Sequence, residues 1–107
     1  MLTKKQVMKI ADSEWDIILK RGYHPLRYQG WHLPDLNESR IYLPKHKDKD
    51  DLAITIIHEL IHARNDERKA ARVRKTKDNE IEEEAKETYK RNPKLFDFIK
   101  ELYQLNI

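Results

Sequence analysis

The segment TIIHELIHARND, residues 55–66, contains two histidines four residues apart, with a glutamate directly after the first. In a helix this spacing places the imidazoles of His58 and His62 one above the other on the same face. Zinc is bound by neutral imidazoles held in fixed directions, so the pattern predicts that both histidines are metal ligands. Glu59 is offset from His58 by about 100°, which keeps it beside the metal without coordinating it. We therefore expect a zinc site with Glu59 as its general base.

A catalytic zinc takes three protein ligands and leaves one position for water, so a third ligand must come from elsewhere. The chain has no cysteine, and the segment NEIEEEAKETY, residues 79–89, offers Glu80, Glu82, Glu83, Glu84 and Glu87. If the buried face of that helix is centred on Ile81, Ala85, Thr88 and Tyr89, Glu83 and Glu87 point to solvent. Glu82 and Glu84 then flank the face. The small Ala85, one turn after Glu82, would let the helix approach the metal, so we expect Glu82 to be the third ligand, with Glu84 as the alternative.

These residues carry a resemblance to a known group of enzymes. His58, Glu59, His62 and a downstream Glu82-x-x-Ala85 resemble the gluzincin, or thermolysin-like, metallopeptidases. The order of predicted elements is similar to the minigluzincins, soluble prokaryotic proteins that look like the catalytic core of integral-membrane metallopeptidases. The resemblance implies a zinc-dependent peptidase. In such a mechanism zinc lowers the pKa of its water, and Glu59 takes the proton as water attacks the scissile carbonyl and passes it to the leaving amine.

Periodicity and turn residues predict an α+β fold, a minimal zincin-like domain that spans residues 1–107. Apolar residues at helical spacing, a capping box of Thr3 with Gln6, and Gly22 as the C-terminal cap predict a first helix from Thr3 to Lys20. Two or three short strands should follow, at residues 25–29, 31–33 and 40–43. Further helices are expected from about residue 51 to beyond residue 68, over residues 79–90, and from residue 92 toward the C-terminus. The aspartates that end KHKDKDD, residues 45–51, are expected to cap the second helix.

Composition limits the classes of partner. The 107 residues include 22 basic and 19 acidic side chains, and the net charge of +3 is small beside that total. A nucleic-acid partner is therefore not implied, and the basic segment 67–77 lacks the interleaved aromatic residues of such a site. The N-terminus has no apolar run of signal-peptide length, and no run elsewhere is long enough to cross a membrane. We expect a cytoplasmic protein with a peptide or unfolded protein as substrate and no membrane insertion.

Other polar residues have weaker assignments. His24, His32 and His46 lie in the strand and loop region and are expected at the surface or in turns rather than on the metal. Asp66 continues the stripe of the two motif histidines and is a candidate acceptor that orients one of them. Tyr42, His46 and Tyr89 are candidate donors to the oxygen that becomes negative during hydrolysis, and the sequence does not choose among them. An exposed strand edge in residues 31–43 is expected to pair with an extended substrate.

The C-terminal segment, residues 92–107, is unusually apolar for a chain end. One interpretation is that its helix completes the core of a small domain. The other comes from the resemblance, because minigluzincins are similar in being described as zymogens held by C-terminal segments. In that case residues 92–107 would block the cleft of the same molecule, or of its partner in a homodimer.

Two rival functions stay open at the level of the sequence. One is a zinc-stabilised interaction module without turnover, which peptide cleavage would exclude. The other is a basic nucleic-acid-binding protein in which the HELIH motif is incidental. Stoichiometric zinc that is lost in His58→Ala would argue against the second.

Overall fold

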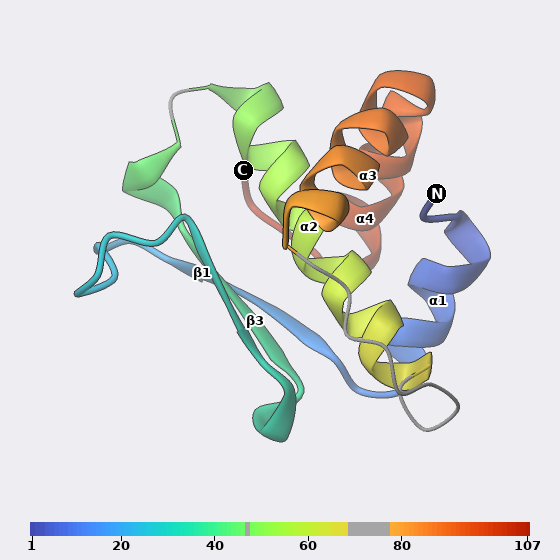
Figure 1. Cartoon of the computed structure of the whole chain (residues 1–107), viewed down its shortest axis with the longest axis horizontal. Helices are drawn as coiled ribbons and strands as arrows, with labels where there is room; N and C mark the ends of the chain where they lie inside the picture. Colours follow the sequence, from blue (N-terminus) through green and yellow to red (C-terminus); the bar gives the residue numbers. More distant parts are fainter. Residues whose placement is uncertain (47, 69–77) are drawn as a thin grey trace.

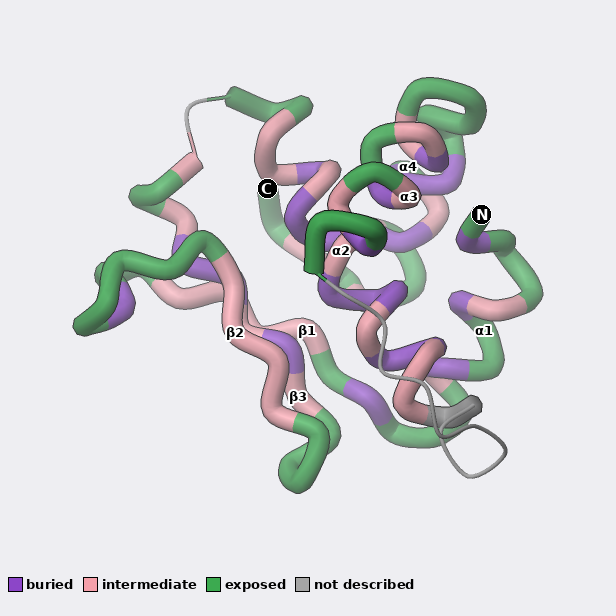
Figure 2. The backbone as a smooth tube through the Cα atoms, viewed as in Figure 1, coloured by how far each residue is buried: buried purple, intermediate pink, exposed green. Residues whose placement is uncertain are grey.

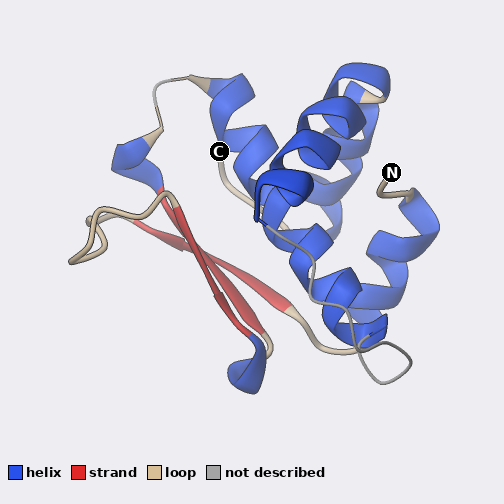
Figure 3. Ribbon diagram, viewed as in Figure 1, coloured by secondary structure: helices blue, strands red, loops and turns tan. Residues whose placement is uncertain are grey.

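The computed structural model describes residues 1–46, 48–68 and 78–107. In chain order its elements are α1 (Lys4–Asp12), β1 (Asp16–Lys20), β2 (Gly30–Leu33), the 3-10 helix η1 (Pro34–Leu36), β3 (Glu38–Tyr42), the 3-10 helix η2 (Leu43–Lys45), α2 (Lys49–Arg68), α3 (Asp78–Arg91) and α4 (Pro93–Leu102). The small sheet lies against one side of the group of α-helices (Figures 1 and 3). The predicted α+β class is confirmed.

The sheet is mixed, with the strand order β1-β3-β2. β1 runs parallel to β3, with Ile18 opposite Arg40, and β2 runs antiparallel to β3, with Trp31 opposite the same arginine. The β2–β3 connection is η1, after which Asn37 adopts the left-handed conformation that asparagine tolerates, with a φ of 51°. Because β3 is central, β2 is an edge strand of the sheet that the described residues form.

The first helix is shorter than predicted. α1 has the expected capping box, in which Thr3 and Gln6 exchange hydrogen bonds, but its C-cap is Ser13 and not Gly22. Glu14 then takes a positive φ of 62°, which interrupts the helix. The run DIILK that follows forms β1, so the helix predicted to Lys20 is wrong over its second half. Branched apolar residues in succession fit a strand as well as a helix face, and pairing with β3 selects the strand.

The strands predicted at residues 31–33 and 40–43 correspond to β2 and β3, whereas the one predicted at residues 25–29 is wrong. Those residues form a turn, in which the Arg27 backbone N–H donates to the His24 carbonyl at 2.8 Å. Arg27 also has a positive φ of 62°, a conformation that a strand does not contain. The sheet thus takes its third strand from before this turn.

Helix α2 is the centre of the molecule. An aspartate of KHKDKDD caps it, but this is Asp48 and not one of the last two: the Asp48 side chain accepts a hydrogen bond from the Asp51 backbone N–H at 2.8 Å, and Asp50 and Asp51 lie in the first turn of the helix. Its fully buried residues include Ile56, Ile57, Leu60 and Ile61. The helix packs on β2 and β3 and on α1 and α3, and Figure 2 shows its buried stretches among these elements. A helix enclosed on most sides is a rigid support for the motif that it carries.

Helices α3 and α4 begin close to the predicted positions. α4 buries Leu95, Phe96 and Ile99 against the rest of the core, and Tyr103 and Leu105 beyond it pack on the same cluster. This packing is what the core interpretation of residues 92–107 requires. The predicted extension of α2 beyond Arg68 and most of the basic segment, residues 69–77, lie outside the described residues. Among the helices that the structure describes, none has the length and apolar character needed to cross a bilayer.

Candidate metal centre

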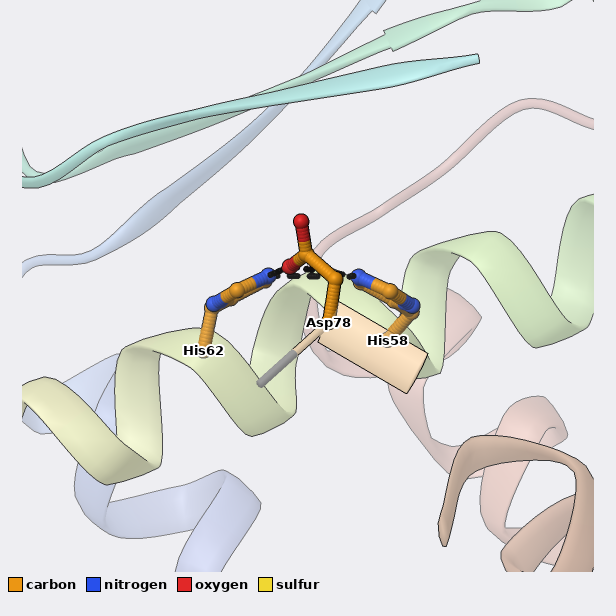
Figure 4. Close-up of side chains that lie close together, drawn as sticks. All are labelled: His58, His62 and Asp78. Atoms are coloured by element: carbon orange, nitrogen blue, oxygen red, sulfur yellow. Dashed lines mark hydrogen bonds and ion pairs between the residues drawn. The ribbon is translucent and has the colours of Figure 1, made fainter. Parts of the chain in front are cut away.

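The two motif histidines converge on one point. α2 projects His58 and His62 toward the sheet, and their Nε2 atoms lie 3.2 Å apart (Figure 4). Both imidazoles are partly buried, with the planes of the two rings 54° apart. The i, i+4 spacing predicted this convergence.

Asp78, the first residue of α3, brings a carboxylate to the same point. Its Oδ1 lies 3.0 Å from Nε2 of His62 and 3.9 Å from Nε2 of His58, and Figure 4 shows the carboxylate between the two rings. These three side chains are a group whose ligand atoms all lie within 4.8 Å of one another. The Asp78 side chain is 83% exposed. Sequence reasoning missed it, although it lies four residues before Glu82 and hence on the same side of α3.

Glu82 and Glu84 lie on opposite borders of the α3 face that packs on α2. Oε1 of Glu82 is 3.6 Å from Nδ1 of His58, beside the ring rather than at the Nε2 atoms. Glu84 instead accepts two hydrogen bonds from the Arg64 guanidinium, at 2.5 and 3.0 Å. These bonds hold the pKa of Glu84 below its ordinary value. Of the two glutamates that the sequence left open, only Glu82 contacts a motif histidine.

Glu59 is buried beside the histidines. Its side chain is enclosed between α2 and β2, and the residue is only 5% exposed. Oε2 has no hydrogen-bond partner among the described residues. Burial, and then the negative charges of Asp78 and Glu82, raise its pKa from 4.5 to about 8.

Gly30 at the start of β2 makes room for the Glu59 carboxyl. A Cβ atom built at residue 30 would lie 2.9 Å from Oε1 of Glu59, which is closer than two such atoms can approach. Any other residue there would displace the acid. No local pattern in the sequence predicts this contact, because it depends on where β2 crosses α2.

His62 is held in its neutral form. Burial, followed by the positive charges that His32 and His58 can carry, lowers its pKa from 6.5 to about 4. A neutral imidazole at neutral pH keeps a lone pair for a metal.

His58, Glu59 and Glu82 border a cavity of about 320 Å³. The residues that line it are Arg27, Tyr28, Gln29, Gly30, Thr55, His58, Glu59 and Glu82. Arg27 and Tyr28 come from the turn before β2, which the sequence analysis took for a strand. No residue from 92–107 is among those that line it.

The three candidate donors for the carbonyl oxygen lie outside this lining. His46 contacts the Asp51 carboxylate through Nδ1 at 2.9 Å and is buried. Tyr89 donates to Asp50 at 2.6 Å, and Tyr42 packs edge-on against His24. Arg27 and Tyr28, which were not considered, are the cationic and phenolic side chains of the cavity.

The histidines expected at the surface are more buried than predicted. His24 is a turn residue, as expected, and its Nδ1 accepts from the Leu26 N–H at 2.9 Å, but its ring is packed against Trp31. His32 lies beside His62 and forms a short hydrogen bond with Asp66. Asp66, a candidate acceptor for one of the two motif histidines, contacts this third histidine instead. The burial of these rings depends on tertiary contacts of the sheet that residue type does not reveal.

Comparison of the chain with protein-family models, curated proteins and solved structures found no match. The functional assignment therefore depends on the motif and on the chemistry of the side chains around it.

Proposed function

We propose that this protein is a zinc-dependent peptidase in which His58, His62 and Glu82 hold the metal and Glu59 is the general base. The observation that carries the proposal is the buried carboxyl of Glu59 beside two imidazoles that converge on one point, with no partner for its Oε2 in the part of the chain that the structure describes. Leaving a polar atom buried without a partner costs free energy, so such an acid is typical of a working site.

The donor atoms support a zinc site. In a tetrahedral site with bonds of about 2.0–2.1 Å, ligand atoms lie roughly 3.3 Å apart. The spacing of 3.2 Å between the histidine Nε2 atoms agrees with that requirement. Two imidazoles and one carboxylate are also a ligand set that zinc takes in hydrolytic enzymes.

The third ligand is a carboxylate from the first two turns of α3. We propose Glu82 because it lines the cavity together with His58 and Glu59. Asp78 is the second candidate, because its Oδ1 lies nearest to the two Nε2 atoms. The two lie four residues apart on one face of α3, the face that approaches the motif histidines.

The chemistry would be shared between the metal and Glu59. Zinc, when bound, supplies a Lewis acid that lowers the pKa of water and of neighbouring acids. Glu59 in its ionised form accepts a proton from water as the water attacks the peptide carbonyl, and then donates that proton to the departing amine. Nothing becomes covalently attached to the protein.

The surroundings of Glu59 support a peptide as substrate. β2 is an edge strand whose first residue, Gly30, contacts Glu59, so an extended peptide that pairs with this edge would pass over the acid. Arg27 and Tyr28 line the same cavity and offer donors to the carbonyl oxygen as it becomes negative.

A zinc site with a purely structural role is the alternative that this geometry disfavours. Such a site is closed by four protein ligands and needs no acid next to it. Here a cavity of about 320 Å³ adjoins His58, and a buried carboxyl faces it. Space for a substrate and an acid beside it are the features of a catalytic centre.

Metal titration of single variants tests the proposed ligands. Glu82→Ala is expected to weaken zinc binding much more than Glu83→Ala, the matched control, because Glu83 is exposed on the same helix. The zinc dissociation constant would be measured by competition with a chromogenic chelator. A larger loss in Asp78→Ala than in Glu82→Ala would transfer the ligand role to Asp78, and unchanged binding in His58→Ala would refute the metal site.

A further inference from the structure

His32, on the edge strand, lies in a stack of three rings. Its imidazole is stacked on Trp15, with ring centroids 4.9 Å apart and planes 20° apart. Its ring is also stacked on His62, at 4.8 Å and 23°. His32 is thus in face contact with a proposed metal ligand although it is not part of the metal-binding group.

The first two rings of the stack, Trp15 and His32, are each tied to the scaffold by a hydrogen bond. Trp15 is buried, and its indole Nε1 donates to the Ser39 hydroxyl on β3 at 2.9 Å. His32 forms a short hydrogen bond through Nε2 with the carboxylate of Asp66, which lies one turn after His62 on α2. Because a carboxylate only accepts, this bond fixes the proton on Nε2 and the plane of the His32 ring. The stack therefore joins the sheet to the metal-binding helix.

The ring of a metal-binding histidine is usually held in one orientation by a hydrogen bond. A histidine that binds a metal through one nitrogen commonly donates the other N–H to a carboxylate or a carbonyl. The contacts of His62 with His58 and Asp78 are made through Nε2. Contact with the face of a fixed ring can replace that bond, because rotation of the His62 ring out of plane would collide with His32.

We propose that His32 is a positioning residue that holds the imidazole of His62 in the plane required for metal binding, with Asp66 and Trp15 fixing His32 in turn. This role rests on the proposed function, since it presumes that His62 binds zinc. Asp66 would then act on the metal site through a second histidine rather than by direct contact with a ligand.

Three variants separate stacking from mere packing. His32→Ala removes the stacked ring and the bond to Asp66. His32→Phe keeps a flat ring of similar size but loses the hydrogen bond to Asp66. Asp66→Asn keeps a side-chain oxygen that can accept the hydrogen bond from His32. Tyr89→Phe is a control, because it deletes a hydrogen bond to Asp50 at 2.6 Å elsewhere on α2.

The readouts are the zinc dissociation constant and the visible absorption spectrum of the cobalt-substituted protein, with circular dichroism to verify folding. We expect His32→Ala to weaken zinc binding about 10- to 100-fold, the range found when groups that orient a ligand are removed, and to alter the cobalt spectrum. His32→Phe and Asp66→Asn should show smaller losses, and Tyr89→Phe none. A general loss of stability would not change the cobalt spectrum of the folded fraction.

Failure of the positioning role can be distinguished from failure of the proposed function. Parent-like zinc affinity and an unchanged cobalt spectrum in folded His32→Ala would overturn the positioning role and leave the metal site intact. Absence of zinc binding by the parent protein would overturn the proposed function, and the positioning role with it.

Discussion

At the scale of single residues, Glu59 has the most unusual environment. It follows His58 on α2 and is turned toward β2, where Gly30 leaves space for its carboxyl. A pKa of about 8 means that the acid changes its charge close to neutral pH. A general base works best when its pKa lies near the working pH, so the burial that is costly for folding is suited to catalysis.

The raised pKa predicts how stability depends on pH in the metal-free protein. Between pH 4.5 and about 8 the unfolded chain has released the Glu59 proton and the folded protein has not, so stability falls as pH rises. Glu59→Gln cannot titrate and should lack this decline. Between pH 6.5 and 8 the parent should lose about 1–2 kcal/mol relative to the variant.

Urea unfolding in the presence of EDTA would measure the difference at the two pH values. This range lies above the window from pH 4 to 6.5 in which the lowered pKa of His62 makes stability rise with pH. The difference in the free energy of unfolding between the parent and Glu59→Gln therefore reports the titration of Glu59 alone. Equal pH dependence in the parent and the variant would show that the acid is not buried in its protonated form.

The sequence predicted some of these residues and not others for a physical reason. The convergence of His58 and His62 follows from the geometry of one helix, and so does the placing of Glu82 and Glu84 on opposite borders of another. The contacts of His32 and Asp78 depend on how β2 and α3 lie across α2. Such contacts are set by tertiary packing and leave no local pattern.

At the scale of elements, an ion pair links α2 to α3 near the metal centre. The Arg64 residue is only 8% exposed, and its guanidinium binds both oxygens of Glu84. The N-terminal amine lies 3.7 Å from the same carboxylate. Because Arg64 lies two residues after His62, the pair holds α3 beside the motif.

Glu84→Gln is expected to destabilise the protein at pH 7 by about 1–2 kcal/mol, after allowance for the partial exposure of Glu84. The pKa of Glu84 is lowered, first by the hydrogen bond from Arg64, so this stability is present above pH 4.5 and is lost as pH falls through the folded pKa. Chemical unfolding at pH 7 and pH 3 would measure it, with exposed Glu83→Gln as the control. A penalty as large at pH 3 as at pH 7 would contradict the ionic origin.

Element prediction failed where one apolar run suited two structures. Ile18 and Leu19 continue the helical spacing of α1, but together with Ile17 they also make a strand that pairs with β3. Pairing with a strand about twenty residues later selects the strand conformation, and local periodicity carries no information about that partner. The helices that carry His58, Glu59, His62 and Glu82 were predicted well because their caps and periodicity are local.

At the scale of the whole molecule, the position of the C-terminal segment favours the core interpretation over blocking within one molecule. Leu95, Phe96 and Ile99 are buried in the core, and no residue from 92–107 lines the cavity of a single molecule. Blocking by the tail of a second copy in a homodimer stays a prediction from the resemblance.

A chain that stops after Leu102 is therefore expected to lose stability and to gain no peptidase activity per molecule. The removed residues include Tyr103 and Leu105, which pack on the core. Thermal unfolding and cleavage of an unstructured peptide would be compared with the full chain, with sedimentation to define the oligomeric state. Increased turnover from the truncated monomer would instead indicate that the tail inhibits the enzyme.

The central claim is that this domain hydrolyses peptide bonds with Glu59 as the base at a zinc centre. The most direct measurement is cleavage of an unfolded protein by the zinc-loaded parent and by Glu59→Gln, each with and without a chelator. The account predicts cleavage by the parent that the chelator abolishes, and a loss of about two to four orders of magnitude in Glu59→Gln although zinc stays bound. Parent-like cleavage by Glu59→Gln, or no cleavage by the zinc-loaded parent, would contradict it.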